Sequence, residues 1–313
     1  MEQEHGLKAN PDNTPVVTGH PSTGVSKAAS TVYEIYLPAA DLRPFIECYW
    51  FLKAIVRPPH QLEEMIFTDA RADIVFVYSS PYLRTASGQR AASTQNTMRT
   101  SNLDAPRPYP VYIHQQGTID LVGVRFRPGG LAPFVRVPVH ELSGWTLSLL
   151  DAFGPHGVEL EGKLFDASGH RPTQVALLDQ FFRRRMVLHR AYHQVKHWMD
   201  VIEQHRGLIA ISRLSEACGY SIRSVDRLFQ RFVGLSPKFF ARTVRFRYVH
   251  RHLMRNPESD WQDIVAFYGY VDQSHFAKDI LSLTGAAPKV YRAFLRRQRD
   301  SLPPNFVHFL QDT

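Results

Sequence analysis

The chain has 313 residues, of which 44% are hydrophobic and 21% charged, values typical of globular proteins with about two domains. No apolar run approaches the ~20 residues of a membrane-spanning helix, and no charged-then-apolar leader opens the chain. Its two cysteines, Cys48 and Cys218, exclude a disulfide framework. We therefore expect a cytoplasmic protein without membrane contact.

The net charge of +8 is unevenly distributed along the chain. Residues 190–300 contain 19 Lys/Arg and 10 Asp/Glu, which leaves 18 and 19 for all other residues. The whole basic excess therefore lies in this carboxy-terminal part. A solvated basic face is the simpler explanation, but the motifs described below coincide with the charge and favour a polyanionic partner.

The amino-terminal half predicts a strand-rich domain. Residues 1–30 are rich in Pro, Ser, Thr, Gly and Asn and predict a disordered tail. Between residues 31 and 126, β-branched and aromatic runs alternate with turn-forming clusters, which predicts strands at YEIYL, ADIVFVY, YPVYI and DLVGVRF. Residues 84–108 predict a polar loop, and DLRPFIECYWFLKA is compatible with either a strand or a short helix.

Helices are predicted after a Pro-Gly-Gly turn that follows the last of these strands. They lie near Glu141, at 145–153 and at 173–189, and the Gly and Pro residues within 155–172 predict a loop. We place the domain boundary near Leu188. The expected units are an amino-terminal domain at 31–187, a helical domain at 188–300 and a tail at 301–313.

Residues 211–232, ISRLSEACGYSIRSVDRLFQRF, predict a helix-turn-helix. Apolar residues at i, i+3 and i+7 mark one face of a first helix. Gly219 permits a tight turn, and Ser221 can cap a second helix. The second helix carries an apolar stripe at Val225, Leu228, Phe229 and Phe232, and the residues off this stripe include Arg223, Asp226, Arg227 and Gln230.

Residues 261–283 repeat this pattern about fifty positions later. An apolar helix beginning at Trp261 is followed by Gly269, by a capping residue, Asp272, and by a helix with an apolar stripe from Phe276 to Leu283. Between the two copies, Gly234 ends one helix and Pro237 suits the first turn of the next. That connecting helix, of about seventeen residues, spans roughly 25 Å. It is a rigid spacer of the right order to hold two recognition helices near one turn of DNA apart.

The segment from about 195 to 292 resembles the DNA-binding domain of the AraC/XylS family of bacterial transcription regulators. The residues that carry the resemblance in the first half are Leu214, Cys218 to Ser221, Arg227, Phe229, Gly234, Ser236, Pro237 and Arg245. In the second half they are Ile264, Gly269, Tyr270, Asp272, Ser274, Phe276, Lys278, Gly285, Pro288, Tyr291 and Arg292. The sequence departs from the family pattern at Val265 and at Asp279-Ile280. These departures affect the expected helix packing and choice of bases, not the expected fold.

The resemblance implies an α+β chain, with a β-rich sensor domain (cupin-like or a small barrel) followed by two helix-turn-helix units joined by a long helix. It also implies a sequence-specific regulator of double-stranded DNA, with activation through RNA polymerase expected rather than repression. A small-molecule effector or a homodimer would involve the sensor domain. The looser resemblance there rests on the run from Gly123 to Gly130 and implies no particular ligand.

The candidate DNA contacts are Arg223, Ser224, Asp226, Arg227, Gln230, Gln273, Ser274 and Lys278. Arg227 suits guanine, Gln273 suits adenine, and Lys278 suits guanine or phosphate. Asp226 can accept from cytosine or orient a neighbouring arginine, and we favour orientation. Alternatively, half of these side chains touch only backbone or solvent. For Arg245, Arg251 and Arg292 we favour positions on the helix surface or pairs within the domain over DNA contacts.

Other polar residues carry weaker hypotheses. Trp50, His114, Arg125 and Arg127 are candidates for lining an effector pocket, although we favour structural roles, with Trp50 in the core and the arginines paired to Asp120 or Asp151. His189, His193 and His197 share a helical face, but no cysteine or carboxylate adjoins them at ligand spacing. We predict neither a metal nor a cofactor, and no catalytic motif supports an enzyme.

Two alternatives belong to other classes. A DNA-repair alkyltransferase fused to such a domain would need a reactive cysteine cluster, and two isolated cysteines argue against it. A nucleoid-type binder would show no sequence preference. The sequence thus favours a regulator and leaves its effector, targets and oligomeric state open.

Overall fold

The structure is a computed structural model that describes residues 17–19, 31–59, 61–88, 91–98 and 100–301. The strands of the amino-terminal part are β1 (Val17–Gly19), β2 (Thr31–Tyr36), β3 (Ile46–Val56), β4 (Leu62–Ile66), β5 (Asp73–Val77), β6 (Tyr82–Gly88), β7 (Ala91–Met98), β8 (Asn102–Asp104), β9 (Val111–Gln115), β10 (Gly117–Phe126) and β11 (Thr146–Ser148). Its helices are η1 (Ala132–Phe134), α1 (Val139–Leu142), α2 (Leu149–Phe153), α3 (Pro155–Asp166) and α4 (Arg171–Arg185).

These strands form two antiparallel sheets. The larger sheet has the order β1-β2-β3-β10-β5-β8-β11, and the smaller has the order β4-β9-β6-β7. The long strands β3 and β10 form the centre of the larger sheet, with Gly123 opposite Trp50 and Leu121 opposite Leu52. A side chain on Gly123 would enter the space that the indole of Trp50 occupies, which explains why glycine stands there.

Successive residues of β10 face two different apolar cores, because side chains alternate across a strand. Ile119 and Leu121 pack with Trp50 in a core confined to the amino-terminal part of the chain, from β1 to α4, which we call the strand domain. Val122 and Val124 belong to a core that the helices cover. The larger sheet therefore has two buried faces.

Helix α4 covers the outer face of the larger sheet. Phe182 of α4 contacts Phe126 and Phe134 at ring-centroid distances of 5.5 and 5.0 Å. Asp179 of the same helix is buried and accepts hydrogen bonds from the hydroxyl of Tyr49 at 2.9 Å and the amide of Ala39 at 3.1 Å. The carboxylate thus ties α4 to the sheet where an apolar residue would leave the tyrosine hydroxyl unpaired.

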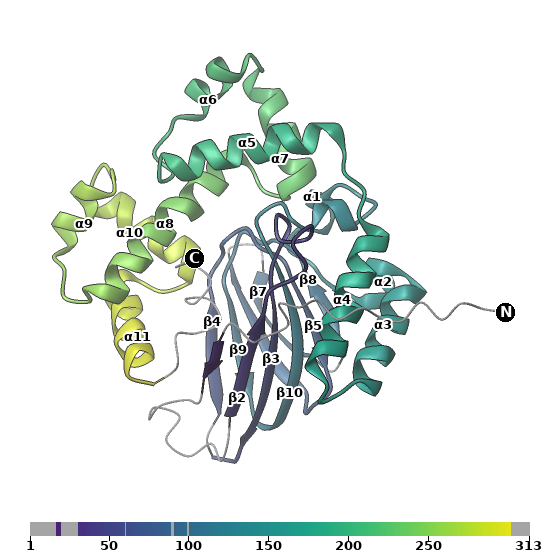
Figure 1. Ribbon diagram of the computed structural model, residues 1–313. Coiled ribbons are helices and arrows are strands. Elements are labelled where there is room, and N and C mark those ends of the chain that lie inside the picture. The colour runs from purple at the N-terminus through teal and green to yellow at the C-terminus, as the bar shows by residue number, and fades with distance from the viewer. Residues whose placement is uncertain (1–16, 20–30, 60, 89–90, 99, 302–313) are drawn as a thin grey trace.

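The carboxy-terminal part consists of α5 (Arg190–Gln204), α6 (Ile211–Cys218), α7 (Ile222–Val233), α8 (Pro237–Arg255), α9 (Trp261–Phe267), α10 (Gln273–Thr284) and α11 (Pro288–Ser301). Figure 1 shows α2, α3 and α4 on one side of the sheets and α9, α10 and α11 on the other, with α5 to α7 across one end. The α+β architecture predicted from the sequence is confirmed. Within the described ranges, no helix is both long and apolar enough to cross a membrane.

Several local predictions were wrong. Residues 84–108 are not a loop, because they include β7, β8 and most of β6. Helix α3 occupies most of the segment 155–172 that predicted a loop, and residues 146–148 form β11 rather than the start of a helix. Within the predicted tail, Val17–Gly19 pairs with β2 as β1, and the rest of residues 1–30 lies outside the described residues, as does 302–313.

The strand domain also buries charge. Arg125 of β10 binds Asp73 of β5 at 2.8 Å, and Arg84 of β6 binds Asp104 of β8 at 2.9 Å. Glu64 of β4 lies half-buried near Arg125 and Asp73. Burial raises the pKa of Glu64 to about 7, with Asp73 adding to the rise and Arg125 opposing it. The folded protein therefore binds a proton at Glu64 more tightly than the unfolded chain does.

This raised pKa predicts a specific pH dependence of stability. The ordinary pKa of a glutamate is near 4.5, and the pKa of Glu64 in the folded state is about 7. As the pH rises between these two values, the folded state loses the advantage of its extra proton. The free energy of unfolding should therefore fall by about 1–3 kcal/mol across this range. Glu64→Gln keeps the side chain neutral, so its denaturation profile should lose this decline. Glu63→Gln, on the neighbouring exposed position, is the matched control. An unchanged slope in Glu64→Gln would contradict the prediction.

Candidate nucleic-acid interface

The first helix-turn-helix consists of α6 and α7. Gly219 ends α6 in the left-handed region, with φ of 68°. Ser221 caps α7 by accepting a hydrogen bond from the amide of Ser224 at 3.2 Å. The apolar stripe of α7 is buried at Val225 and Phe229. The opposite side is open, with Arg223 and Arg227 exposed and Ser224, Asp226 and Gln230 half-buried.

The second unit, α9 and α10, has the same local design. Gly269 has φ of 65° in the turn, and Asp272 caps α10 by accepting from the amide of His275 at 2.7 Å. Phe276, Ile280 and Leu283 are buried. All three predicted DNA-contacting residues of this helix are exposed, namely Gln273, Ser274 and Lys278.

Helix α8 joins the two units. Ser236 caps it, Pro237 occupies its first turn, and its 19 residues correspond to roughly 28 Å at 1.5 Å per residue. The buried carboxylate of Asp279, on α10, accepts from Arg242 of α8 at 2.6 Å and from the hydroxyl of Tyr270 at 3.3 Å. The departure from the family pattern at Asp279 therefore fastens α10 to the connecting helix.

Other basic residues have contacts within the helical domain. Arg245 donates to the carbonyl of Gly207 at 3.2 Å, and the guanidinium of Arg292 lies 3.5 Å from the ring centre of Trp261. The guanidinium of Arg251 lies over Tyr248 at 5.6 Å. These positions agree with the contacts within the domain that the sequence favoured over DNA contact.

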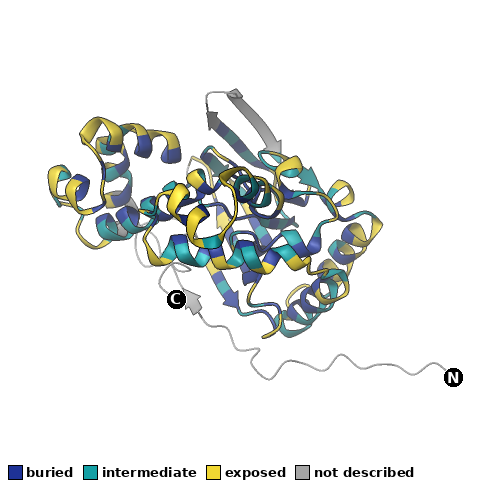
Figure 2. Cartoon of the chain, turned by 90° about the horizontal axis from the view of Figure 1, so that it is seen from above, coloured by how far each residue is buried: buried dark blue, intermediate teal, exposed yellow. Residues whose placement is uncertain are grey.

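The strand domain binds the carboxy-terminal ends of both predicted recognition helices. At the end of α7, the hydroxyl of Ser143 donates to the carbonyl of Gly234 at 2.9 Å. At the end of α10, the hydroxyl of Tyr112 donates to the carbonyl of Thr284 at 2.9 Å, and the amide of Thr68 donates to the carbonyl of Leu283 at 3.3 Å. The opposite, amino-terminal ends of α7 and α10 begin with exposed residues. Figure 2 shows helices that are buried along one side and exposed along the other.

Apolar packing reinforces both contacts. Phe67, next to β4, lies 5.1 Å from Phe246 of α8 between ring centres. Phe45, before β3, lies 5.6 Å from Tyr192 of α5. One continuous core extends from the larger sheet through α4 and α5 to α7 and α8, and a second joins Met65 and Phe67 to α8, α10 and α11.

The structure separates the four residues predicted to bind an effector. Trp50 and Arg125 lie on neighbouring strands, both buried. Arg125 binds Asp73, a partner that the sequence did not suggest, and Asp120 binds Lys53. His114 lies on β9 of the other sheet, beside Glu63 at 3.7 Å. Arg127 follows β10 and donates to the carbonyl of Arg43 at 2.9 Å. They do not converge on one pocket.

Two further interpretations concern Asp226 and the histidines. Within the described ranges, no ion pair joins Asp226 to Arg223 or Arg227, so the structure shows no orientation of either arginine by this carboxylate. His189 accepts a hydrogen bond from the amide of Ala191 at 3.1 Å and caps α5. No group of three or more His, Cys, Asp or Glu residues in the described part of the chain is arranged to hold a metal.

Sequence reasoning missed a cavity between α3, α4 and α7. Its volume is about 620 Å³, and its basic lining residues are Arg136, Lys163, Arg184, Arg185 and Arg231. None of the four predicted effector residues lines it. The run of three arginines at the end of α4 was the signal available in the sequence, but its neighbours across the cavity come from distant segments.

Two family models match the chain. Residues 34–148 match a domain of unknown function (DUF6597), and residues 214–293 match a helix-turn-helix domain. No curated protein is similar enough in sequence to count as a relative of this chain.

Several solved structures are similar at low identity. Apo ToxT from Vibrio cholerae strain SCE256 shares 11% identity and a TM-score of 0.42 over 79% of this chain and 97% of that one. Wild-type ToxT from the same strain, with an unsaturated fatty acid bound, shares 10% identity and a TM-score of 0.41 over 78% of this chain and 94% of that one. Vicilin from Corylus avellana shares 14% identity and a TM-score of 0.25 over 32% of this chain and 29% of that one. Because all these TM-scores lie below 0.5, nothing is carried over from these proteins to this chain.

The paired units, their caps and the family match define a protein that binds DNA through two helix-turn-helix motifs. Residues 214–293 form a helix-turn-helix domain of the AraC type, as the sequence predicted. The protein is therefore a DNA-binding transcription regulator.

The contact at the end of α7 can be tested with two glycines. Gly234 and Gly219 both have positive φ, so alanine at either position should cost about 1–2 kcal/mol of backbone strain. A Cβ on Gly234 would also clash with the Ser143 hydroxyl and lie 2.8 Å from Val139, whereas one on Gly219 meets nothing within 4 Å. Gly234→Ala should therefore lose about 1–3 kcal/mol more unfolding free energy than Gly219→Ala, measured by denaturant titration. Equal losses would show that the domains do not touch there.

Proposed function

We propose that the protein binds a bipartite DNA sequence and activates transcription, with α7 and α10 reading successive segments of the major groove. The observation that carries this proposal is the placement of the two helices. Both have capped amino-terminal ends with exposed polar or basic residues, and both have their other ends fixed on the strand domain. Side chains near the amino-terminal end of such a helix are the ones that reach base edges.

The side chains suit this role. On α7, Arg227 is a donor for guanine and Arg223 for guanine or phosphate, and Ser224, Asp226 and Gln230 complete the surface. On α10, Gln273 suits adenine and Lys278 suits guanine or phosphate, with Ser274 between them in sequence. The carboxylate of Asp226 can accept from cytosine N4, which gives it a direct role in base reading.

Control by a small molecule is the further element of the proposal. The strand domain contacts both recognition helices, so a ligand that alters this domain can change how they are presented to DNA. In this proposal, activation proceeds through contact with RNA polymerase, a homodimer is compatible with a repeated target site, and the protein acts in the cytoplasm without catalysing a reaction.

The DNA-reading roles are tested by selecting random duplex DNA with the full chain, alongside Arg227→Ala and Lys278→Ala. We expect a motif of two halves about 34 Å apart, one half relaxed in each variant. Each lost contact should remove about 1–3 kcal/mol of discrimination at its base. Binding of single-base variants of the selected site, measured at one fixed salt concentration, gives these values.

The matched control is Arg57→Ala, which removes an exposed positive charge from the strand domain. It should retain the complete motif. Binding that depends on salt but not on sequence would instead support a nucleoid-type protein. Loss of affinity without relaxed specificity in Arg227→Ala would assign that arginine to phosphate.

A further inference from the structure

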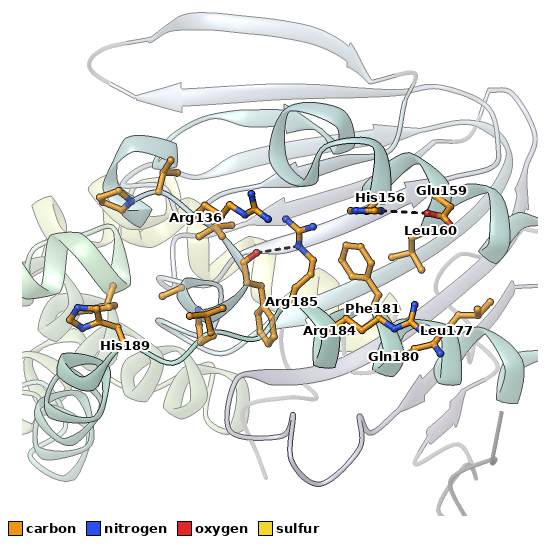
Figure 3. A pocket seen from close by; sticks show the side chains of 18 of the residues that line it. Arg136, His156, Glu159, Leu160, Leu177, Gln180, Phe181, Arg184, Arg185 and His189 are labelled. Atoms are coloured by element: carbon orange, nitrogen blue, oxygen red, sulfur yellow. Dashed lines mark hydrogen bonds and ion pairs between the residues drawn. The ribbon is translucent and has the colours of Figure 1, made fainter. Parts of the chain in front are cut away.

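The cavity between α3, α4 and α7 lies where the two domains meet. Its volume of about 620 Å³ falls in the ~300–1,000 Å³ range of small-molecule sites. One wall comes from η1 and the residues after it, a second from α3 and α4, and a third from His189, Arg231 and Phe232 of the helical domain (Figure 3). A molecule in this cavity would therefore touch both domains.

One part of the cavity lining is apolar. Phe134, Leu160 and Phe232 are buried, and Leu177 and Phe181 are half-buried. Three of these five side chains are phenylalanines, which favour a ring stacked or packed edge-on against them. The cavity can thus accept an apolar body and gains most from an aromatic one.

The rest of the lining is strongly basic. Five Lys or Arg side chains face one acid, Glu159. That carboxylate is already bound by Lys163 at 2.6 Å and lies 3.5 Å from His156. Across the described part of the chain, no carboxylate lies within ion-pair distance of Arg136, Arg184, Arg185 or Arg231. Among the described residues, no acid is therefore paired with any of these four arginines.

Arg185 is held in place at the centre of this group. It donates to the carbonyl of Phe153 at 3.2 Å, and its guanidinium lies over the rings of Phe153 and Phe181 at 5.2 and 5.4 Å. Figure 3 shows the guanidinium of Arg136 beside it. Burial first, and then the charge of Arg136, lower the pKa of Arg185. A bound anion would relieve the repulsion between the two arginines, and guanidinium groups match carboxylates well.

We propose that this cavity is a binding site for an organic carboxylate with an aromatic body, held by Arg136 and Arg185 at its head and by Phe134, Phe181 and Phe232 around its rings. We further propose that a ligand bound in this cavity changes the affinity of the protein for DNA, and this second part rests on the proposed regulator function. Arg231 and Phe232 belong to the last turns of α7, close to Gly234, which Ser143 binds. The ligand thus contacts the opposite end of the helix whose amino-terminal end would read bases.

The test uses the full chain and three probes of increasing size, benzoate, 2-naphthoate and biphenyl-4-carboxylate, titrated by calorimetry. At least one should bind with a stoichiometry of one. The neutral amide of the best probe should bind at least tenfold more weakly, because it lacks the charge that the arginines pair. Inorganic phosphate, which has charge but no rings, should also bind at least tenfold more weakly.

The variants are Arg136→Gln and Arg185→Gln, each expected to weaken the best probe at least tenfold. Arg136 is exposed and forms no ion pair with a described residue, so its removal should leave folding intact even if Arg185→Gln does not. The matched control is Arg183→Gln. This exposed arginine belongs to the same run on α4 but binds Asp41 at 2.7 Å and does not line the cavity. It should bind the probe as the wild type does.

The outcomes separate this inference from the proposed function. If none of the three carboxylates binds at millimolar concentration, or if Arg183→Gln weakens binding as much as Arg136→Gln, the site is overturned. Affinity for a DNA duplex carrying the selected motif is then measured with and without the best probe. A shift of at least threefold that Arg136→Gln abolishes supports control of DNA binding. Unchanged DNA affinity would overturn the control of DNA binding by the ligand. Sequence-specific DNA binding without ligand would support the proposed function in either case.

Discussion

Two apolar surfaces of the strand domain must be removed from water, and the rest of the structure depends on how they are covered: the outer face of the larger sheet, and a patch of the smaller sheet at Met65 and Tyr112. Helix α4 and its neighbours cover the larger sheet. The DNA-binding domain itself covers the patch on the smaller sheet, since Met65, Tyr112 and the neighbouring Phe67 pack with α8, α10 and α11. The second helix-turn-helix unit is therefore a structural layer of the strand domain as well as a DNA-binding element.

The polar contacts between the strand domain and the DNA-binding domain fix the direction of α7 and α10 rather than supply most of the stability. The last carbonyls of a helix have no partner within the helix, and both recognition helices bring theirs to donors of the strand domain. The opposite ends, which Ser221 and Asp272 cap, carry exposed polar or basic side chains. The same arrangement keeps the positive ends of both helix dipoles on the side that a polyanion would approach.

The DNA-binding domain was predictable because its signals are local. Ser221 and Asp272 cap helices that follow directly after them, and Gly219, Gly234 and Gly269 have the positive φ that their turns require. Which bases each side chain meets stays a prediction, since that depends on the DNA. Asp279 appeared only as a departure from the family pattern, because its partner Arg242 lies a helix away.

The strand domain was harder because its signals are distant. Strands β6 and β7 are polar, and pairing with each other and with β9 stabilises them, which no local pattern reveals. The cavity was missed for a related reason. Arg136 follows η1, Arg185 ends α4 and Arg231 lies on α7, so only the folded chain brings the three charges together.

The sharing of Phe67, Tyr112 and Ser143 between the two domains limits how this protein can be recombined. A DNA-binding domain that can be cut out and joined to another sensor needs a surface of its own that tolerates water. Here, removal of α8 to α11 would expose Met65, Phe67 and Tyr112, and removal of the strand domain would leave Phe246 without Phe67. A sensor from another regulator would have to present the same aromatic residues and hydroxyl donors, so the two domains do not form independently exchangeable units.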